Sequence, residues 1–406
     1  MTETPHIDWS DIEGLSALIE ALGGPDKARL VGGCVRDRLL GVPVGDIDIA
    51  TVHLPEATMA LLDKAGIKAI PTGIDHGTVT AVIDGHPFEI TTLRSDVATD
   101  GRHAVVRYSD DWAEDAARRD FTINALYSDA ATGTVFDYTD GLSDIEGPHV
   151  RFIGDPAQRI AEDHLRILRY FRFLARFGAQ TPDPAALAAC HEARKSLMTL
   201  SRERVSGELM RLLAADDPSD AIAQMDAIDL FESFLPEIGE KPGEHMRALV
   251  TVEAECAVEA RAERRLSLLL PPEKRTIEKV AARLKLSNKL RQSLVDIAQA
   301  RARLPDLPPR PLAYRHGIDA ARDAVLIESA LSGRDMSGQL STLSGWVVPQ
   351  LPIKGGELIR RGVAAGPEVS RLLRQIEDRW VEEGFPENEG WDAIVRDSLT
   401  SSTRGQ

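Results

Sequence analysis

Two short stretches near the N-terminus decide the fold: residues 30–37 read Leu-Val-Gly-Gly-Cys-Val-Arg-Asp, and residues 45–49 read Gly-Asp-Ile-Asp-Ile. This pattern predicts a strand, a glycine-rich turn, a short helix and a second strand. Asp46 and Asp48 are two residues apart on the second strand, so their side chains share one face while the intervening isoleucines point to a core. Two such carboxylates repel each other unless a cation lies between them, and Mg²⁺ is commonly shared between carboxylates and substrate phosphates.

The glycine-rich turn adds a candidate phosphate site. Gly32 and Gly33 let the backbone approach a phosphate closely, and the N-terminus of the following helix favours an anion. Arg36 lies one turn into that helix, where its guanidinium can hold a phosphate. Each feature alone is also typical of a solvated strand or a plain tight turn. Because all of them occur within about twenty residues, together they indicate phosphoryl or nucleotidyl transfer from a nucleoside triphosphate.

The composition limits the class of protein. A chain of 406 residues with 43% hydrophobic residues is expected to form about two to four domains with ample cores. Its formal net charge of −16 argues, taken alone, against a nucleic-acid-binding protein. Three distant cysteines fit a reducing compartment and exclude a cysteine-based zinc site. Without a signal peptide or an apolar run of membrane length, a cytoplasmic location is expected.

The first 150 residues have the mixed pattern of a small sheet covered by helices. Periodicity and turn residues mark the ends of each predicted element, with Asp84-Gly85 as a hairpin turn. The predicted elements are helices over 8–22, 55–65 and 113–125, strands over 69–71, 78–83, 86–93 and 135–138, and a mobile polar loop over 94–112.

Beyond Pro156 the sequence predicts helices and no confident strand, starting with one long helix over 157–177. The predicted fold class is therefore α+β, with a catalytic head followed by an all-helical remainder. We expect a head over residues 1–150, a helical neck over 151–215, and a helical body and tail over 216–406 that bind RNA.

A second motif reads Arg-Arg-Asp-Phe-Thr-Ile-Asn-Ala over residues 118–125. It brings two guanidinium groups and an amide close together in the sequence. Arg119 is a candidate for gripping a triphosphate, and Asn124 is a candidate for binding a ribose hydroxyl. A solvated arginine pair next to an asparagine that caps a turn is the alternative, and the residues alone leave it open.

A third motif lies on the predicted helix over 157–177. Asp163 and Arg166 are neighbours at a spacing of three residues, which is also the spacing of an ordinary intrahelical ion pair. A carboxylate accepts from the exocyclic amine of cytosine or adenine, and a guanidinium donates to the adjacent ring nitrogen. Such a pair would bind C or A and reject G and U. Arg169 can share the site, whereas Arg172 would face half a turn from Asp163 on a continuous helix.

Basic residues gather around this third motif. Residues 151–211 contain eleven Lys and Arg against seven Asp and Glu, which makes the segment about +4 within a chain of net charge −16. A local basic stripe is what contacts to a phosphate backbone need. A solvated helix face has the same composition, so the stripe supports the argument without deciding it.

With these motifs in order, the chain resembles the class II nucleotidyltransferases of the polymerase-β superfamily: bacterial CCA-adding enzymes and their poly(A) polymerase relatives. The resemblance extends over roughly residues 25–215. The matching stretches are residues 30–48, 94–112 as the family's flexible loop, 118–126, 162–172 and 201–212.

The resemblance implies a role for each matching position. It implies a polymerase-β-like head in which Asp46 and Asp48 are catalytic and hold Mg²⁺, with Glu89 as a candidate third carboxylate. It includes Arg172 despite the helical geometry. The implied nucleotide-binding residues are Gly33, Arg36, Arg119, Asp163, Arg166, Arg169 and Arg172.

The implied activity is addition of C, C and A to the tRNA 3′ end from CTP and ATP, with diphosphate released and no nucleic-acid template. The expected partners are tRNA and the two nucleotides, with neither DNA nor a membrane. A poly(A) polymerase usually has a basic residue after the first glycine, so Gly32-Gly33 favours CCA addition. An enzyme that adds only A stays open, whereas the intact loop argues against one that adds only C.

Two further alternatives lie outside tRNA end repair. A non-catalytic RNA-binding relative would be expected to have lost a metal carboxylate or the Asp163–Arg166 pair, and all of these are present. A nucleotidyltransferase that modifies proteins or antibiotics would have no use for a pair selective for C and A.

Overall fold

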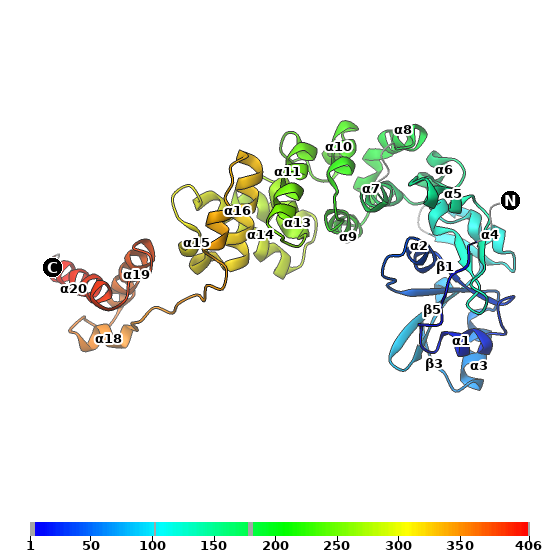
Figure 1. Ribbon diagram of the computed structural model, residues 1–406, viewed down its shortest axis with the longest axis horizontal. Coiled ribbons are helices and arrows are strands. Elements are labelled where there is room, and N and C mark those ends of the chain that lie inside the picture. The colour runs from blue at the N-terminus through cyan, green and yellow to red at the C-terminus, as the bar shows by residue number, and fades with distance from the viewer. Residues whose placement is uncertain (1–4, 101–102, 178–181, 405–406) are drawn as a thin grey trace. The chain divides into compact units, whose positions relative to one another are not determined.

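The chain divides into two compact units, each described here on its own. The computed structural model describes residues 5–100, 103–177 and 182–404 (Figure 1). The first unit comprises residues 1–200 and 227–234, and the second comprises residues 201–226 and 235–406. No helix among the described residues has both the length and the apolar character needed to cross a membrane.

A mixed seven-stranded sheet forms the centre of the first unit and confirms the α+β head. The strand order is β3-β4-β5-β2-β1-β8-β9. Only β2 and β5 run parallel, and the other neighbouring pairs are antiparallel. The strands are β1 (Ala28–Val31), β2 (Ile47–Thr51), β3 (Lys68–Gly73), β4 (Thr78–Ile83), β5 (His86–Thr92), β8 (Leu126–Ser128) and β9 (Val135–Asp137).

The alternation predicted for β2 is confirmed. Ile47 and Ile49 are buried in the core of the head, and Asp48 points to the opposite face. The hairpin between β4 and β5 is also confirmed, because Asp84 and Gly85 both have positive φ angles, of 49° and 85°. Two consecutive residues with positive φ form the tight turn whose twist matches that of the flanking strands.

Three predictions for the head were wrong in detail. The helix predicted over 8–22 is only α1 (Leu15–Ala21), because Gly14 has a φ of 77° and the chain before it is irregular. The loop predicted over 94–112 was also wrong for most of its described residues, because β6 (Arg94–Asp100) and β7 (His103–Tyr108) form a separate two-stranded ribbon. The described pairing in this ribbon contains a register shift, which explains its weak strand periodicity.

The helix predicted over 113–125 is also shorter than expected. It is α4 (Trp112–Ala117), whose N-terminus is capped by Asp111, and it is followed by the 3-10 turn η2 (Thr122–Asn124) and the unpredicted strand β8. The remaining helices of the head are α2 (Gly33–Leu39), α3 (Pro55–Lys64) and α5 (Gly141–Glu146).

The long helix predicted over 157–177 is two helices, α6 (Pro156–Glu162) and α7 (Arg166–Phe177). Asp163 has extended backbone angles, with φ at −151°, and its side chain accepts a hydrogen bond from the Leu165 N–H at 3.1 Å. Short acidic side chains compete for backbone donors in this way, which favours turns over helix interiors. Asp163 and Arg166 are therefore not neighbours on one continuous helix.

After Pro156 the described chain contains helices and no strand, as predicted. These helices form the end of the first unit and all of the second (Figure 1). Besides α6 and α7 they are α8 (Pro184–Ala193), η3 (Arg194–Thr199), α9 (Arg202–Leu213), α10 (Ser219–Ala227), η4 (Phe231–Ser233), α11 (Pro242–Glu255), α12 (Ala262–Leu269), α13 (Lys274–Arg283), α14 (Asn288–Arg303), α15 (Pro309–His316), α16 (Ile318–Ser332), α17 (Ser337–Ser341), α18 (Gly355–Arg360), α19 (Pro367–Glu382) and α20 (Asn388–Arg404).

The second unit has a buried ionic cluster where α11, α12 and α16 meet. Arg264 and Arg265 are each 1% exposed, and both donate to Glu253, at 2.6 and 2.8 Å. Arg264 also donates to Asp323 at 2.7 Å, and Arg265 donates to the Leu213 carbonyl at the end of α9. Charges this far from water are tolerated only when they are paired.

We expect Glu253→Gln to destabilise the second unit by roughly 3 kcal/mol, because two buried guanidinium groups lose their shared charge partner. The unfolding of the helices in urea, followed by circular dichroism, measures this change. Glu244→Gln is the matched control, because this side chain is 69% exposed and its pair with Lys241 contributes little. Equal midpoints for the two variants would contradict a stabilising role for the cluster.

Candidate active site

The predicted metal carboxylates lie at the exposed face of the sheet. Asp48 is half-buried on β2, and its partner in the parallel register is Glu89 on β5. Asp46 is exposed just before β2 begins. Burial and the charges of Glu89 and Asp46 raise the pKa of Asp48 to about 6, against the lowering effect of Arg119. The three carboxylates therefore concentrate negative charge at one place on the sheet.

This donor set fits a hard divalent cation. Carboxylate oxygens are the ligands that Mg²⁺ prefers, and such ions usually take their remaining ligands from water and substrate phosphates. Within the described part of the chain, no group of three or more His, Cys, Asp or Glu side chains is arranged to hold a metal by itself. This observation fits a metal site in which the substrate supplies some of the ligands better than one in which protein side chains supply all of them.

The glycine-rich turn lies against the second motif. Gly32 has a φ of 78° and a ψ of −126°, a backbone conformation that residues other than glycine rarely adopt. A Cβ atom at Gly32 would lie 3.5 Å from Nη1 of Arg119 and 3.6 Å from the Asn124 carbonyl. A Cβ atom at Gly33 would lie 3.6 Å from Nη2 of Arg36. The turn and both predicted phosphate-binding arginines are thus in one place.

Arg36 lies beneath this turn and is only 4% exposed. Its guanidinium donates to Asp37, at 2.9 Å from Nε and 2.7 Å from Nη2, and to Oδ1 of Asn124. It also lies close to the rings of Phe173 and Phe177 on α7. The structure therefore places Arg36 between the glycine-rich turn and α7.

A chain of polar contacts continues from Asn124 into α7. The Asn124 amide donates to Asp120 Oδ1 at 3.1 Å, and Arg169 donates from Nε to Asp120 Oδ2 at 2.7 Å. Burial raises the pKa of Asp120, but Arg169 and the hydrogen bonds from Asn124 outweigh it, so the pKa is lowered. Arg176, further along α7, donates to Asp37 at 2.9 Å and holds the other end of the chain. We call this set the head–neck network.

A second network is centred on Asp115 of α4, whose side chain is 1% exposed. Arg118 donates to Oδ1 at 2.9 and 2.7 Å, and Arg119 donates to Oδ2 at 3.3 and 3.0 Å. The Tyr127 hydroxyl donates to Oδ2 at 2.7 Å, and the Arg94 backbone N–H donates to Oδ1 at 3.2 Å. Burial raises the pKa of Asp115, but Arg119 and Arg118 outweigh it and lower the pKa to about 2.

The residues predicted to read the base lie at the end of α6, where Asp163 follows the last helical residue, and on α7, which carries Arg166, Arg169 and Arg172. Arg166 donates to Glu162 at 2.5 Å and to the carbonyls of Arg159, at 2.9 Å, and Arg118, at 3.3 Å. Arg169 and Arg172 lie within 5.6 and 4.3 Å of the Phe173 ring centroid. The geometric objection to Arg172 assumed a helix unbroken through Asp163, and that assumption was wrong; the role of Arg172 stays a prediction.

The structure thus collects every predicted site residue in the first unit. Sequence reasoning gave no role to Asp115, Asp120 or Tyr127, which connect the predicted residues. Asp115 had one usable sign, because it stands three and four residues before Arg118 and Arg119. No pattern pointed to Asp120 or Tyr127, since their partners are brought together only by the fold.

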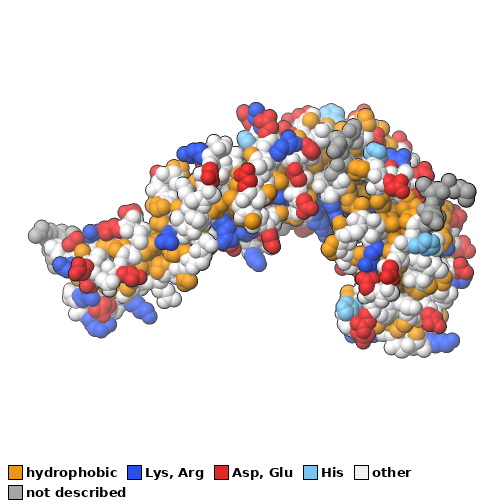
Figure 2. Space-filling model, in the orientation of Figure 1, with side chains coloured by type: hydrophobic (Ala, Val, Ile, Leu, Met, Phe, Trp, Pro, Cys, Tyr) orange, Lys and Arg blue, Asp and Glu red, His pale blue; other side chains and the backbone are white. Residues whose placement is uncertain are grey.

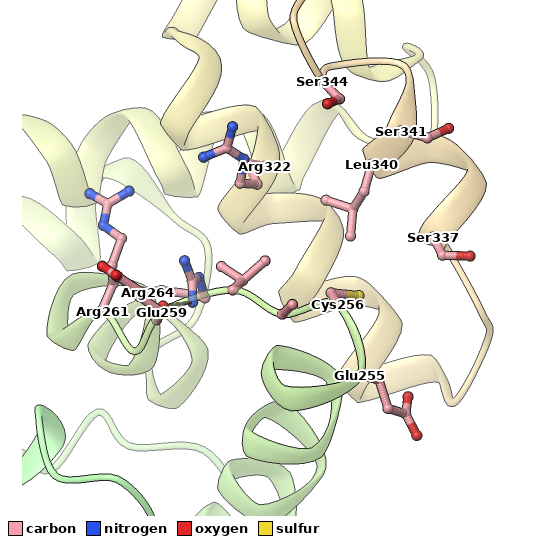
Figure 3. Close-up of a pocket in the computed structure, with 12 residues that line it drawn as sticks. Glu255, Cys256, Glu259, Arg261, Arg264, Arg322, Ser337, Leu340, Ser341 and Ser344 are labelled. Carbon is pink, nitrogen blue, oxygen red and sulfur yellow. Dashed lines mark hydrogen bonds between the residues drawn. The ribbon is translucent and has the colours of Figure 1, made fainter.

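A pocket of about 650 Å³ in the second unit lacks this chemistry (Figure 3). Its walls include Arg261, Arg264 and Arg322, together with Cys256 and the serines around α17. Arg264 is fully occupied by the buried ionic cluster described above. Glu255 and Glu259 also line the pocket, but they do not lie on neighbouring strands, and no glycine-rich turn lies beside them.

Comparison with known proteins agrees with this geometry. Residues 28–151 match the family model described as the poly A polymerase head domain, and residues 181–241 match a probable RNA and SrmB-binding site of polymerase A. The mouse protein named CCA tRNA nucleotidyltransferase 1, mitochondrial, is 34% identical over 397 residues, which cover 94% of this chain and 89% of the relative. The chain belongs to the family of CCA-adding enzymes. It is therefore a nucleotidyltransferase, and the family implies dependence on a divalent metal.

Bacterial members of the family are also similar over nearly the full length. The CCA-adding enzyme of Limosilactobacillus fermentum is 31% identical, with 94% of each chain covered. The crystal structure of the Bacillus stearothermophilus CCA-adding enzyme in complex with CTP superposes with a TM-score of 0.77 at 28% identity, covering 96% of this chain and 98% of that one. The Thermotoga maritima enzyme complexed with tRNA shares the fold, with a TM-score of 0.67 at 21% identity.

The Asp115 network makes a prediction about pH. Because the pKa of Asp115 is near 2 when folded and near 3.8 when unfolded, its ionised form stabilises the fold by about 2 kcal/mol at neutral pH. This stabilisation is complete above pH 3.8 and is lost as the pH falls toward 2. We expect the stability difference between the wild type and Asp115→Asn, measured by urea unfolding, to shrink by roughly half between pH 7 and pH 3. A difference that does not change with pH would contradict this assignment.

Proposed function

We propose that this chain adds C, C and A in turn to the 3′ end of tRNA, using CTP and ATP and releasing diphosphate. One observation carries the proposal. The Asp120–Arg169 contact joins the sheet with the paired carboxylates to the helix with the base-selective residues. A template-independent enzyme needs these two elements in fixed relation, because it must choose the base and transfer the nucleotide in one site. The full-length similarity to relatives named CCA-adding enzymes supports the same activity.

In this proposal Asp46 and Asp48 are the catalytic carboxylates and hold the divalent ion, which we assign as Mg²⁺. When bound, the metal supplies Lewis acidity toward the attacking hydroxyl and the phosphates. The half-buried Asp48 orients this site from β2, and the neighbouring Glu89 adds negative charge that favours a cation. Because two side chains supply only part of the metal's ligands, and the substrate supplies others, we expect tight metal binding only when the nucleotide is bound.

Nucleotide binding is assigned to residues around the glycine-rich turn. Gly33 lets the backbone approach the phosphates, and Arg119 provides a guanidinium at the edge of the turn. We propose that Arg36 acts by holding Asn124, which belongs to the same motif as Arg119 and whose backbone carbonyl lies 3.6 Å from the Cβ position of Gly32. The buried pairing of Arg36 supports this positioning role.

Base selection is assigned to Asp163, Arg166, Arg169 and Arg172. A carboxylate and a guanidinium together match the donor and acceptor edges of C and A, and they leave unpaired groups against G and U. The half-exposed side chains of all four residues support contact with a ligand. Their partners in the head, Asp120 and the Arg118 carbonyl, tie this edge to the triphosphate site.

The RNA partner is assigned to the basic segment over residues 151–211 and to the helical body and tail beyond it. Acidic and basic side chains are interspersed on the face shown in Figure 2, so local contacts rather than the total charge would hold the tRNA. We also propose a cytoplasmic site of action, with no DNA or membrane partner.

Two activities on the same fold compete with this proposal: polymerisation of A alone, and addition of a single A. We would incubate the protein with tRNA lacking its 3′ end, Mg²⁺, and CTP, ATP or both, and size the products on a sequencing gel. The proposal predicts C, C and A followed by a halt. A long ladder of A, or one A added only to tRNA that already ends in CC, would contradict it.

We expect Asp48→Asn to lower the rate of nucleotide addition by at least about 100-fold, because it removes a charged oxygen ligand at the metal. Single-turnover incorporation of CMP measures this effect. Asp129→Asn serves as the control, since Asp129 is buried in the same head and its side chain accepts from the Ala131 N–H and the Thr132 hydroxyl, away from the carboxylates of the sheet. A wild-type rate in Asp48→Asn would show that the Asp48 carboxylate is not needed for the reaction.

We expect Arg166→Ala to relax base selection by roughly 10- to 100-fold, because one good base contact is worth about 1–3 kcal/mol of discrimination. The measured quantity is the ratio of UTP or GTP incorporation to CTP incorporation by the same variant. Loss of all incorporation in equal proportion would instead assign Arg166 a purely structural role.

A further inference from the structure

The ribbon of β6 and β7 is attached to the head through one carboxylate. Asp115 accepts six hydrogen bonds from four residues, and its side chain is 1% exposed. One of the donors is the backbone N–H of Arg94, the first residue of β6. Two others come from Arg119, the guanidinium assigned to the triphosphate. The Arg94 N–H of the ribbon thus bonds to Oδ1 of Asp115, and the Arg119 guanidinium of the phosphate site bonds to Oδ2 of the same carboxylate.

The other end of the ribbon returns to the same place. Ser109, which follows β7, donates from its backbone to the Leu93 carbonyl at 2.9 Å. Trp112 at the start of α4 packs edge-on against Tyr127, with ring centroids 5.5 Å apart. The guanidinium of Arg29 lies 4.3 Å from the centroid of the same Trp112 ring. Both ends of the ribbon therefore rest on the residues around Asp115.

Arg119 spans the distance between Asp115 and the glycine-rich turn. Its Nε and Nη2 atoms donate to Asp115, while Nη1 lies 3.5 Å from the Cβ position of Gly32. A phosphate held at the turn would meet the Nη1 edge of a guanidinium whose other edge is fixed by the carboxylate. Because a guanidinium is planar and rigid, fixing one edge on the carboxylate also fixes the orientation of the edge that faces the turn.

Arg118 extends the connection toward the base-selective helix. Its side chain donates to Asp115, and its carbonyl accepts from Arg166 at 3.3 Å. The Asp115 cluster therefore contacts the ribbon, the triphosphate site and the base site, each through a hydrogen bond that the structure shows.

We infer that Asp115 is a positioning residue that couples the β6–β7 ribbon to triphosphate binding at Arg119. The inference rests on the proposed function, which assigns Arg119 to the triphosphate. Coupling between two sites is reciprocal, so a ribbon that orders Arg119 is itself ordered when a triphosphate binds. The triphosphate is common to CTP and ATP, and the coupling is accordingly independent of the base.

Hydrogen exchange of peptides from residues 94–108 tests the coupling in the full chain. In the wild type, CTP and inorganic triphosphate should each slow exchange in the ribbon by roughly fivefold or more, which is the lower end of typical coupling between sites. CMP, which lacks the triphosphate, should leave the exchange unchanged. In Asp115→Asn the slowing by either triphosphate should be lost.

Two further variants make the test specific. Tyr127→Phe removes one donor to Asp115 and keeps both guanidinium groups, so it should fold and show reduced slowing even if Asp115→Asn does not fold. Asp129→Asn changes a buried aspartate whose side chain accepts from Ala131 and Thr132 in its own turn, and it should behave as the wild type.

The outcomes separate this inference from the proposed function. Calorimetry reports whether CTP binds the wild type at all. If CTP binds but ribbon exchange does not respond, or responds equally in Asp115→Asn, the coupling is refuted and the proposed function stands. If CMP slows exchange as much as CTP, the coupling does not act through the triphosphate. If CTP does not bind, both are refuted.

Discussion

The ion pair between Asp120 and Arg169 is the contact on which the rest of the site depends. Asp120 follows the two arginines of the second motif, and Arg169 lies one turn into α7, so the pair joins the sheet region to α7. Arg169 donates at 2.7 Å to a carboxylate whose side chain is 11% exposed. Together with the contacts of Arg166 to the Arg118 carbonyl and of Arg176 to Asp37, it fixes the residues proposed to select the base relative to the proposed metal carboxylates.

This contact is sustained by complete pairing of the charges behind it. The buried guanidinium of Arg36 and the amide of Asn124 satisfy each other and continue to Asp120. A partly satisfied network at this depth would cost more than an apolar core, because each unpaired group would keep its desolvation penalty. The same rule governs the Arg264–Glu253 pair in the second unit, which has no part in the chemistry.

The sequence predicted those parts of the fold that depend on local pattern. The alternation around Asp48 gave the strand and its exposed carboxylate, and Asp84-Gly85 gave the hairpin, because both follow from the geometry of a few consecutive residues. The helix predicted through Asp163 was wrong, since the apolar period continues on both sides of this residue although its extended backbone ends α6. The ribbon over 94–112 was missed because an isolated two-stranded pair with a register shift has little apolar alternation.

The predicted site residues were chosen by motif, and the structure adds the connections that no motif contains. Asp115 and Tyr127 are twelve residues apart, and Asp120 and Arg169 are 49 apart, so their pairing depends on the tertiary fold. The specific roles of Asp46, Asp48 and the nucleotide-binding residues stay proposals. These residues all lie in one unit of a chain that belongs to the CCA-adding family, and the proposed roles account for that.

A double-mutant cycle on Asp120 and Arg169 tests the central claim most directly. It compares kcat/KM for CMP addition in Asp120→Asn, Arg169→Gln and the double variant. If this pair holds head and neck as one site, the double variant should be no worse than the more damaging single variant, with a coupling energy of about 1 kcal/mol or more. Effects that simply multiply would show that the two residues act independently and would contradict the account.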